Sequence, residues 1–200
     1  RRIADTQGRF GRNRAYRGDI MKRSACALSA ALVLLTGCAR NEPAIPDENG
    51  VYPAEMLFDY FFSDDMPWDE TKEFKVPEYP DVKFQWSDLD VTATDDGEEN
   101  SLYWGMPVWN VYLTDLNGDG KREICSAVSM GSGLVDERIY AYDLANGKLY
   151  ELSDRFSYNY KLELHDGVLV YVKTPETAEG EETSEPLTID KMTETDESQI

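Results

Sequence analysis

The stretch Asp115-Leu116-Asn117-Gly118-Asp119-Gly120-Lys121-Arg122-Glu123 separates two apolar runs and decides how this chain is expected to fold. Oxygen-bearing side chains stand at its first, third, fifth and ninth positions, and its two glycines allow the backbone to curl until those oxygens converge on one cation. This spacing is typical of a calcium-binding loop. The predicted calcium ligands are Asp115, Asn117, Asp119 and Glu123, together with the backbone carbonyl of Lys121.

The flanks of this loop predict strands. Residues 108–113 precede it and residues 124–128 follow it, and both runs are rich in apolar side chains. An EF-hand would need a helix on each side and a bidentate Glu at the twelfth loop position, where this chain has Ser126. We therefore expect a β-hairpin whose turn binds calcium. The alternative is an Asn-Gly or Asp-Gly turn that binds no ion.

Outward from the hairpin, apolar and polar residues alternate in further short segments, which is the pattern of half-buried strands. Turn signals separate these segments at Asp95-Asp96-Gly97, Ala145-Asn146-Gly147 and Asp166-Gly167. The sequence predicts a mainly β fold, with a single antiparallel β-meander or sandwich-like domain over residues 82–174. Within it, a shared buried face is expected for Tyr158, Tyr160, Leu162 and Leu164, with Lys161 and His165 facing water.

The segments on either side of 82–174 predict less structure. A short helix is expected at residues 52–62, because Pro53 opens the segment and apolar residues follow at helical spacing. An acidic connector continues to residue 81. Residues 175–200 are acidic and poor in apolar side chains, so we expect a mostly disordered tail with at most one edge strand at 187–189.

The N-terminal region has the pattern of a targeting signal. Met21-Lys22-Arg23 is a basic start, an apolar run follows at 25–35, and Leu35-Thr36-Gly37-Cys38 closes it. This pattern resembles a bacterial lipoprotein signal peptide. The resemblance implies cleavage before Cys38 and a diacylglycerol, with acyl chains such as palmitate, on its thiol. Residues 38–51 would then tether a domain to the outer leaflet of the cytoplasmic membrane, and residues 1–20 would be upstream sequence translated from a start codon placed too early.

Charge and cysteine content narrow the class of protein. The whole chain has a net charge of −19, and residues 1–37 carry +6, so residues 38–200 carry about −25. A protein part this acidic is not expected to bind nucleic acid, and it attracts divalent cations. Cys26 would leave with the signal and Cys38 would carry lipid. Cys125 is then alone, and we predict a small core residue without a disulfide.

The mature part also resembles two known families. The loop at 115–123 is similar to the calcium-binding hairpins of FG-GAP and VCBS repeats, although the absence of an internal repeat argues against a complete propeller. The stretches 102–109 (LYWGMPVW), 131–138 (GSGLVDER) and 152–155 (LSDR) resemble the extracellular C-terminal domain of BlaR-like transmembrane metallopeptidases of Firmicutes. The Ser-x-x-Lys and His-Glu-x-x-His motifs of that family are missing. The resemblance therefore implies an outer-face domain without peptidase or β-lactam chemistry.

Catalytic and glycan-binding patterns are weak in this sequence. Gly131-Ser132-Gly133 lacks the Gly-x-Ser-x-Gly elbow, and the one histidine, His165, falls on the polar face of a predicted strand. The aromatic residues Tyr103, Trp104 and Trp109 are expected in the core rather than on a glycan-binding surface.

The sequence therefore predicts a noncatalytic lipoprotein that acts as a binding or sensory module on the extracytoplasmic face of the cell membrane, with a cell-wall or protein ligand. One alternative is a hydrolase of cell-wall or carbohydrate polymer that uses Asp136, Glu137 or Asp154 as its acid. The other is a structural partner of a membrane complex.

Overall fold

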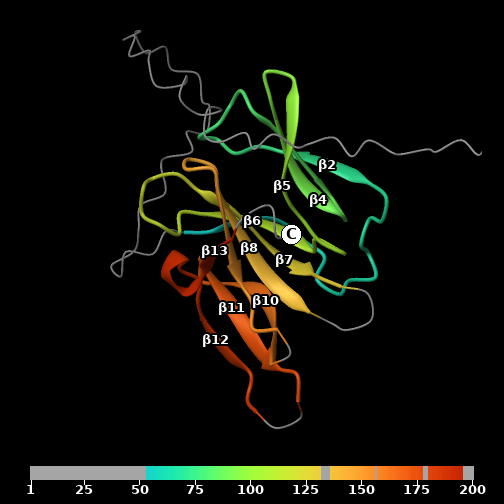
Figure 1. The fold of residues 1–200 in the computed structure, drawn as a ribbon, viewed down its shortest axis with the longest axis vertical. Helices are drawn as coiled ribbons and strands as arrows, with labels where there is room; N and C mark the ends of the chain where they lie inside the picture. The colour runs from blue at the N-terminus through green and yellow to red at the C-terminus, as the bar shows by residue number, and fades with distance from the viewer. Residues whose placement is uncertain (1–52, 132–135, 156, 178–179, 196–200) are drawn as a thin grey trace, which may run out of the picture.

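A computed structural model describes residues 53–131, 136–155, 157–177 and 180–195 of the chain. These residues form three antiparallel sheets and contain no α-helix (Figure 1). Within the same ranges no helix has the length and apolar character needed to span a membrane. The predicted signal peptide, lipidation site and tether all lie outside the described residues. The prediction of a mainly β, antiparallel protein is confirmed.

The largest sheet has six strands and contains the hairpin predicted around the calcium loop. Its order is β1 (Glu55–Asp59), β6 (Asn110–Thr114), β7 (Glu123–Ser129), β8 (Glu137–Asp143), β9 (Lys148–Leu152) and β13 (Thr193–Thr195). Strands β6 to β9 follow one another as neighbours, whereas the first and last strands of the described chain form the two edges. The calcium-loop sequence is the connection between β6 and β7.

Two smaller sheets complete the fold, one above and one below the large sheet in Figure 1. The upper sheet has four strands in chain order: β2 (Thr71–Phe74), β3 (Lys83–Ser87), β4 (Asp90–Asp95) and β5 (Glu98–Trp104). The lower sheet has the order β10 (Tyr158–His165), β11 (Val168–Pro175) and β12 (Thr183–Pro186), and a short 3₁₀ helix, η1 (Ile189–Lys191), leads to β13. Strand β10 contacts β7 and β8, and β5 contacts β8, so both small sheets pack against the middle of the large one.

The predicted buried face of β10 is confirmed in part, because Tyr158 is only partly buried. Tyr160 and Leu162 are buried on β10, while His165 is exposed at the end of that strand. Leu164 was predicted to be buried but is exposed, because the strand reaches its turn at this point and no longer covers another sheet. Cys125 is fully buried, as predicted for a core thiol.

The predicted helix at 52–62 is wrong. Residues 55–59 form β1, which pairs antiparallel with β6. The pairing is irregular between Met56 and Phe58, where the register shifts. Such a bulge interrupts the alternation with a period of two, so the apolar residues acquire a spacing that resembles that of a helix.

The expectation of a mostly disordered tail is also corrected over the part of the tail that is described. Residues 183–195 contain β12, η1 and β13, and the side chains of Leu187 and Met192 are buried. Every residue of β12 is exposed, so its composition gives no apolar signal although its backbone pairs with β11. Main-chain pairing thus orders a segment whose side chains alone would not predict it.

Candidate metal site

The loop between β6 and β7 curls around the carboxylate of Asp115. The backbone N–H groups of Gly118 and Gly120 each donate to this carboxylate at 2.7 Å, and that of Asp119 donates at 3.2 Å. Both glycines have positive φ, 76° and 82°, which is the left-handed region that side chains other than glycine's disfavour. The two glycines therefore give the loop the curl that the sequence predicted.

Glu123, at the start of β7, closes the loop from the other side. Its side chain accepts from the backbone N–H of Leu116 at 2.6 Å and from Asn117 Nδ2 at 2.7 Å, and only 1% of the residue is exposed. Burial raises the pKa of Glu123 to about 8, with further increases from the negative charges of Asp143 and Asp115. The surroundings of Glu123 therefore disfavour its ionised form.

Asp143, at the end of β8, is a site residue that sequence reasoning missed. It is 2% exposed, and Asn117 Nδ2 donates to its Oδ2 at 3.2 Å. Its other contacts are with the turn that follows, where the backbone N–H and Nδ2 of Asn146 donate at 3.0 and 2.7 Å. The sequence signal was ambiguous, because an Asp before Asn-Gly is an ordinary turn residue. The pairing of β7 with β8 brings it beside Glu123.

The three buried carboxylates of Asp115, Glu123 and Asp143 form no salt bridge with any Lys or Arg in the described part of the chain. The nearby Lys121 directs its Nζ over the ring of Tyr79, 5.8 Å from the centroid. The hydroxyl of Tyr79 is buried and has no hydrogen-bond partner in the structure. Burial raises the pKa of Tyr79, and the charges of Asp119 and Asp143 raise it further, so this hydroxyl also borders the acidic site.

The chemistry of the donors fits a calcium ion, but the side chains do not yet converge on one point. Carboxylates, an amide oxygen and a backbone carbonyl are the hard oxygen ligands that calcium takes. Among the residues that the structure describes, however, no three His, Cys, Asp or Glu side chains stand ready to hold a metal. The loop oxygens accept N–H groups instead, as with the bond from the Asp119 N–H to Asn117 Oδ1 at 2.9 Å. Calcium binding would exchange such bonds for metal contacts.

The other acidic residues singled out in the sequence have separate partners. Asp136 pairs with Arg138 at 2.7 Å. Glu137 is buried, and it accepts from Ser129 Oγ at 2.8 Å and from Trp109 Nε1 at 3.2 Å. Asp154 is exposed, and its Oδ2 lies 3.7 Å from Nζ of Lys173 on β11. His165 is exposed, as predicted, and its Nε2 lies 2.7 Å from Oε2 of Glu163. These contacts do not assemble an acid, a base and a nucleophile.

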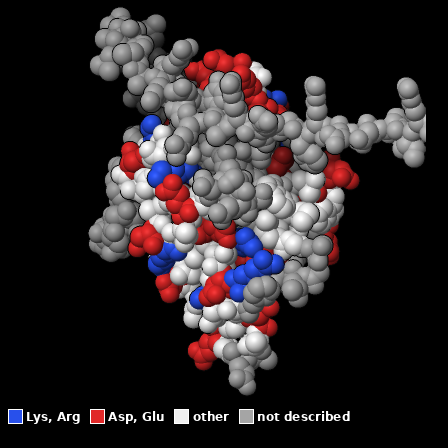
Figure 2. Space-filling model, viewed as in Figure 1, with Lys and Arg blue, Asp and Glu red and all other residues white. Residues whose placement is uncertain are grey.

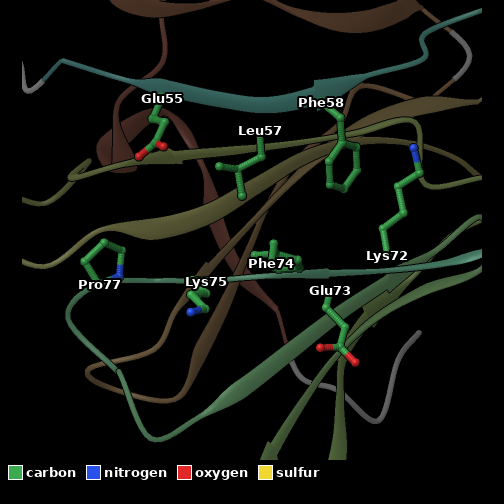
Figure 3. Close-up of a pocket in the computed structure, with 8 residues that line it drawn as sticks. All are labelled: Glu55, Leu57, Phe58, Lys72, Glu73, Phe74, Lys75 and Pro77. Carbon is green, nitrogen blue, oxygen red and sulfur yellow. The ribbon is translucent and has the colours of Figure 1, made fainter.

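An open groove lies between β1 and β2, the free edges of two sheets, and the sequence did not indicate it. Figure 3 shows Leu57 and Phe58 directed from β1 toward β2. The volume of the groove is about 530 Å³. The side chain of Lys72 crosses the gap, with Nζ over the rings of Phe58 and Tyr60 at 5.9 and 4.6 Å. The lining residues are Glu55, Leu57, Phe58, Lys72, Glu73, Phe74, Lys75 and Pro77.

Comparison with known proteins adds no further site. No protein-family model, curated protein or solved structure matches this chain. The resemblances to FG-GAP and VCBS hairpins and to the outer domain of BlaR-like proteins therefore remain predictions from the sequence. Any function has to be argued from the residues themselves.

Proposed function

We propose that this chain is a noncatalytic binding or sensory module, built as a sandwich-like β domain that calcium stabilises. The observation that supports it is the cluster of buried carboxylates of Asp115, Glu123 and Asp143, which form no salt bridge with a cationic side chain among the described residues. In this proposal the module stands on the extracytoplasmic face of the cell membrane, held by lipid on Cys38.

Buried negative charge needs compensation, because removing a carboxylate from water costs several kcal/mol unless it is paired or protonated. The raised pKa of Glu123 is the response of this site when only N–H groups are present. A calcium ion would neutralise the same charges without protonation. The proposed ligands are Asp115, Asn117, Asp119, Glu123 and the carbonyl of Lys121, with Asp143 as an addition from the neighbouring hairpin.

The proposal predicts that calcium raises the melting temperature of the protein. At a free calcium concentration about 100 times the dissociation constant, linkage adds about 2.7 kcal/mol to the free energy of unfolding. Asp115→Ala should abolish the calcium-dependent part of this rise. Lys121→Ala is the matched control and should retain it, because only the backbone of Lys121 is proposed to bind. Magnesium should stabilise less, since it demands a stricter octahedral geometry.

Scanning calorimetry and titration calorimetry test this proposal together. The expected result is a calcium-dependent shift in melting temperature and a saturable heat of binding near millimolar calcium, the range of extracellular modules. A wild-type protein whose melting temperature and heats ignore millimolar calcium would show that the loop is only a turn.

The location is tested separately, at the N-terminus of the mature protein. Stable attachment needs several acyl chains on the one cysteine, because a single chain binds membranes only marginally. Mass spectrometry of the native protein should find a lipid-modified N-terminal Cys38, and Cys38→Ala should release the domain or leave it uncleaved. An unmodified Cys38 in the membrane fraction would contradict the proposed anchor.

A further inference from the structure

Two large aromatic side chains are exposed on the segment that joins β1 to β2, and they flank a third. Phe62 is 64% exposed and Trp68 is 54% exposed. The ring of Trp109, on the chain leading into β6, lies between them, with centroid distances of 4.9 Å to Phe62 and 6.4 Å to Trp68. Phe61 packs against the same ring at 5.6 Å. These four residues are called the aromatic platform below.

The platform is fixed from beneath. Met66, which lies between Phe62 and Trp68 in the sequence, is buried. Its carbonyl accepts a hydrogen bond from the backbone N–H of Trp68 at 2.9 Å. The indole N–H of Trp109 donates to Ser129 Oγ at 2.7 Å and to the buried Glu137 at 3.2 Å. The rings are therefore presented by an ordered segment whose core anchor and indole hydrogen bonds limit their movement.

The backbone at Phe62 makes the exposure of its ring more notable. Its φ is 49°, in the left-handed region that a bulky side chain rarely adopts. Its ring packs on Phe61 and Trp109 but remains 64% exposed, so burial offsets little of the cost of this backbone conformation. Strain of this kind concentrates at positions that contact ligands.

An acidic rim surrounds the platform. Asp64, Asp65, Asp69 and Glu70 lie within the same segment, and all four are exposed. None of them forms a salt bridge in the described part of the chain. No Lys or Arg occurs between residues 60 and 71, and the next one, Lys72, donates to the hydroxyl of Tyr60. Exposed ring faces are thus combined with carboxylates that no Lys or Arg of the described residues pairs with.

We propose that the aromatic platform and its acidic rim bind an Arg- or Lys-bearing segment of a partner protein. A guanidinium or ammonium group is attracted to the face of an aromatic ring, most strongly to tryptophan. A guanidinium can also donate two parallel hydrogen bonds to one carboxylate, so the same side chain can use ring and rim together. Charge complementarity argues against a polyanion here, and a neutral glycan would leave the charge of the four carboxylates uncompensated. This surface is separate from the calcium loop and the proposal does not depend on it.

A second acidic cluster in this protein can serve as a control for binding by charge attraction alone. The turn and adjoining strand ends of the β4–β5 hairpin carry Asp95, Asp96, Glu98 and Glu99, an equal number of carboxylates without exposed aromatic rings. Figure 2 shows acidic side chains gathered at the end of this hairpin, at the top of the view. A cation attracted only by negative charge would not distinguish the two clusters, whereas a cation–π contact would favour the cluster beside the platform.

The test uses the full chain in calcium-containing buffer, titrated with a fluorescein-labelled hexa-arginine peptide and followed by fluorescence anisotropy. Phe62→Ala with Trp68→Ala should weaken binding about tenfold, as expected for the loss of two cation–π contacts. Neutralising the rim by Asp64→Asn, Asp65→Asn, Asp69→Asn and Glu70→Gln should weaken it at least as much. The same four changes at Asp95, Asp96, Glu98 and Glu99 should alter the affinity less than about threefold.

The substituted side chains are exposed except for the partly exposed Asp95, and circular dichroism will verify that each variant retains the β fold. Equal losses from the two acidic clusters would overturn the proposal and leave only general charge attraction. Equal affinity for a hexa-citrulline peptide, which is uncharged, would also overturn it. So would binding of a neutral chito-oligosaccharide that depends on Phe62 and Trp68 when hexa-arginine does not bind, because the platform would then be a carbohydrate surface.

Discussion

Asn117 joins two hairpins through a single amide group. Its Nδ2 donates to Glu123 at 2.7 Å and to Asp143 at 3.2 Å, while its Oδ1 accepts the backbone N–H of Asp119. The amide N–H groups thus stand between two buried carboxylates and relieve part of their repulsion. Because only the amide oxygen can bind a cation, the proposed calcium site requires this side chain to exchange its contacts.

The contribution of Asp143 should change sign with calcium. Asp143→Asn should lower calcium affinity by about 10- to 100-fold, the range found when a contact supporting a metal site is removed. In chelator the same variant should be as stable as the wild type or more so, because one of three clustered charges is gone. Titration calorimetry and melting with and without chelator provide both measurements. An equal loss of stability in the two conditions would mean that Asp143 only orders the β8–β9 turn through Asn146.

Glu137 should make stability depend on pH. Burial raises its pKa above the ordinary value of 4.5, against the hydrogen bonds from Ser129 and Trp109, which lower it. The folded state then keeps the proton to higher pH than the unfolded state. This contribution to stability is complete below the ordinary pKa and is lost as pH rises through the raised value.

Glu137→Gln should therefore remove part of the fall in the free energy of unfolding as pH increases. Urea unfolding of wild type and variant between about pH 4 and pH 8 measures the two slopes. Parallel profiles would show that Glu137 keeps its ordinary pKa in the folded protein.

At the scale of single strands, β10 offers a direct test of register. Leu162 is buried, whereas its neighbour Lys161 is partly exposed and forms an ion pair with Glu163 at 2.8 Å. Leu162→Ala should cost about 2 to 5 kcal/mol, and Lys161→Ala less than about 1 kcal/mol. Chemical unfolding of the two variants checks the difference. Similar losses at both positions would place the wrong face of β10 against the core.

Alternation predicted strands with one buried face, such as β3 and β10. Strands β6 and β7 are buried almost throughout, and their apolar runs beside the loop predicted them instead. The sequence around β1 predicts a helix instead of a strand, because the register of β1 is irregular at Met56 and Phe58. The sequence of β12 does not predict a strand, because its backbone pairs with β11 while all its side chains are exposed. The curl of the β6–β7 loop was predictable because it is local, and its glycines have the expected positive φ. Asp143 was not, because only the pairing of β7 and β8 brings it to Glu123.

At the scale of the whole molecule, the C-terminal segment is part of the domain. Strand β13 pairs with β9, and the side chains of Leu187 and Met192 are buried before it. Leu187→Ala should therefore lower the free energy of unfolding by about 2 to 5 kcal/mol, in one cooperative transition. Thr183→Ala, at an exposed position of β12, is the control and should change little. Thermal melting of both variants measures this, and an unchanged Leu187→Ala variant would show that the segment is not docked.

The order of the six-stranded sheet has a consequence for the time course of folding. Its edge strands come from the two ends of the described chain, with Glu55 opposite Leu113 and Thr193 opposite Glu151. Both pairings close long loops, which slows the search for the native state. Until residues 193–195 are available, β9 keeps an open edge that can pair with another chain. A nascent chain of this protein would therefore pass through an interval of vulnerability to aggregation, which ends only when β13 docks on β9.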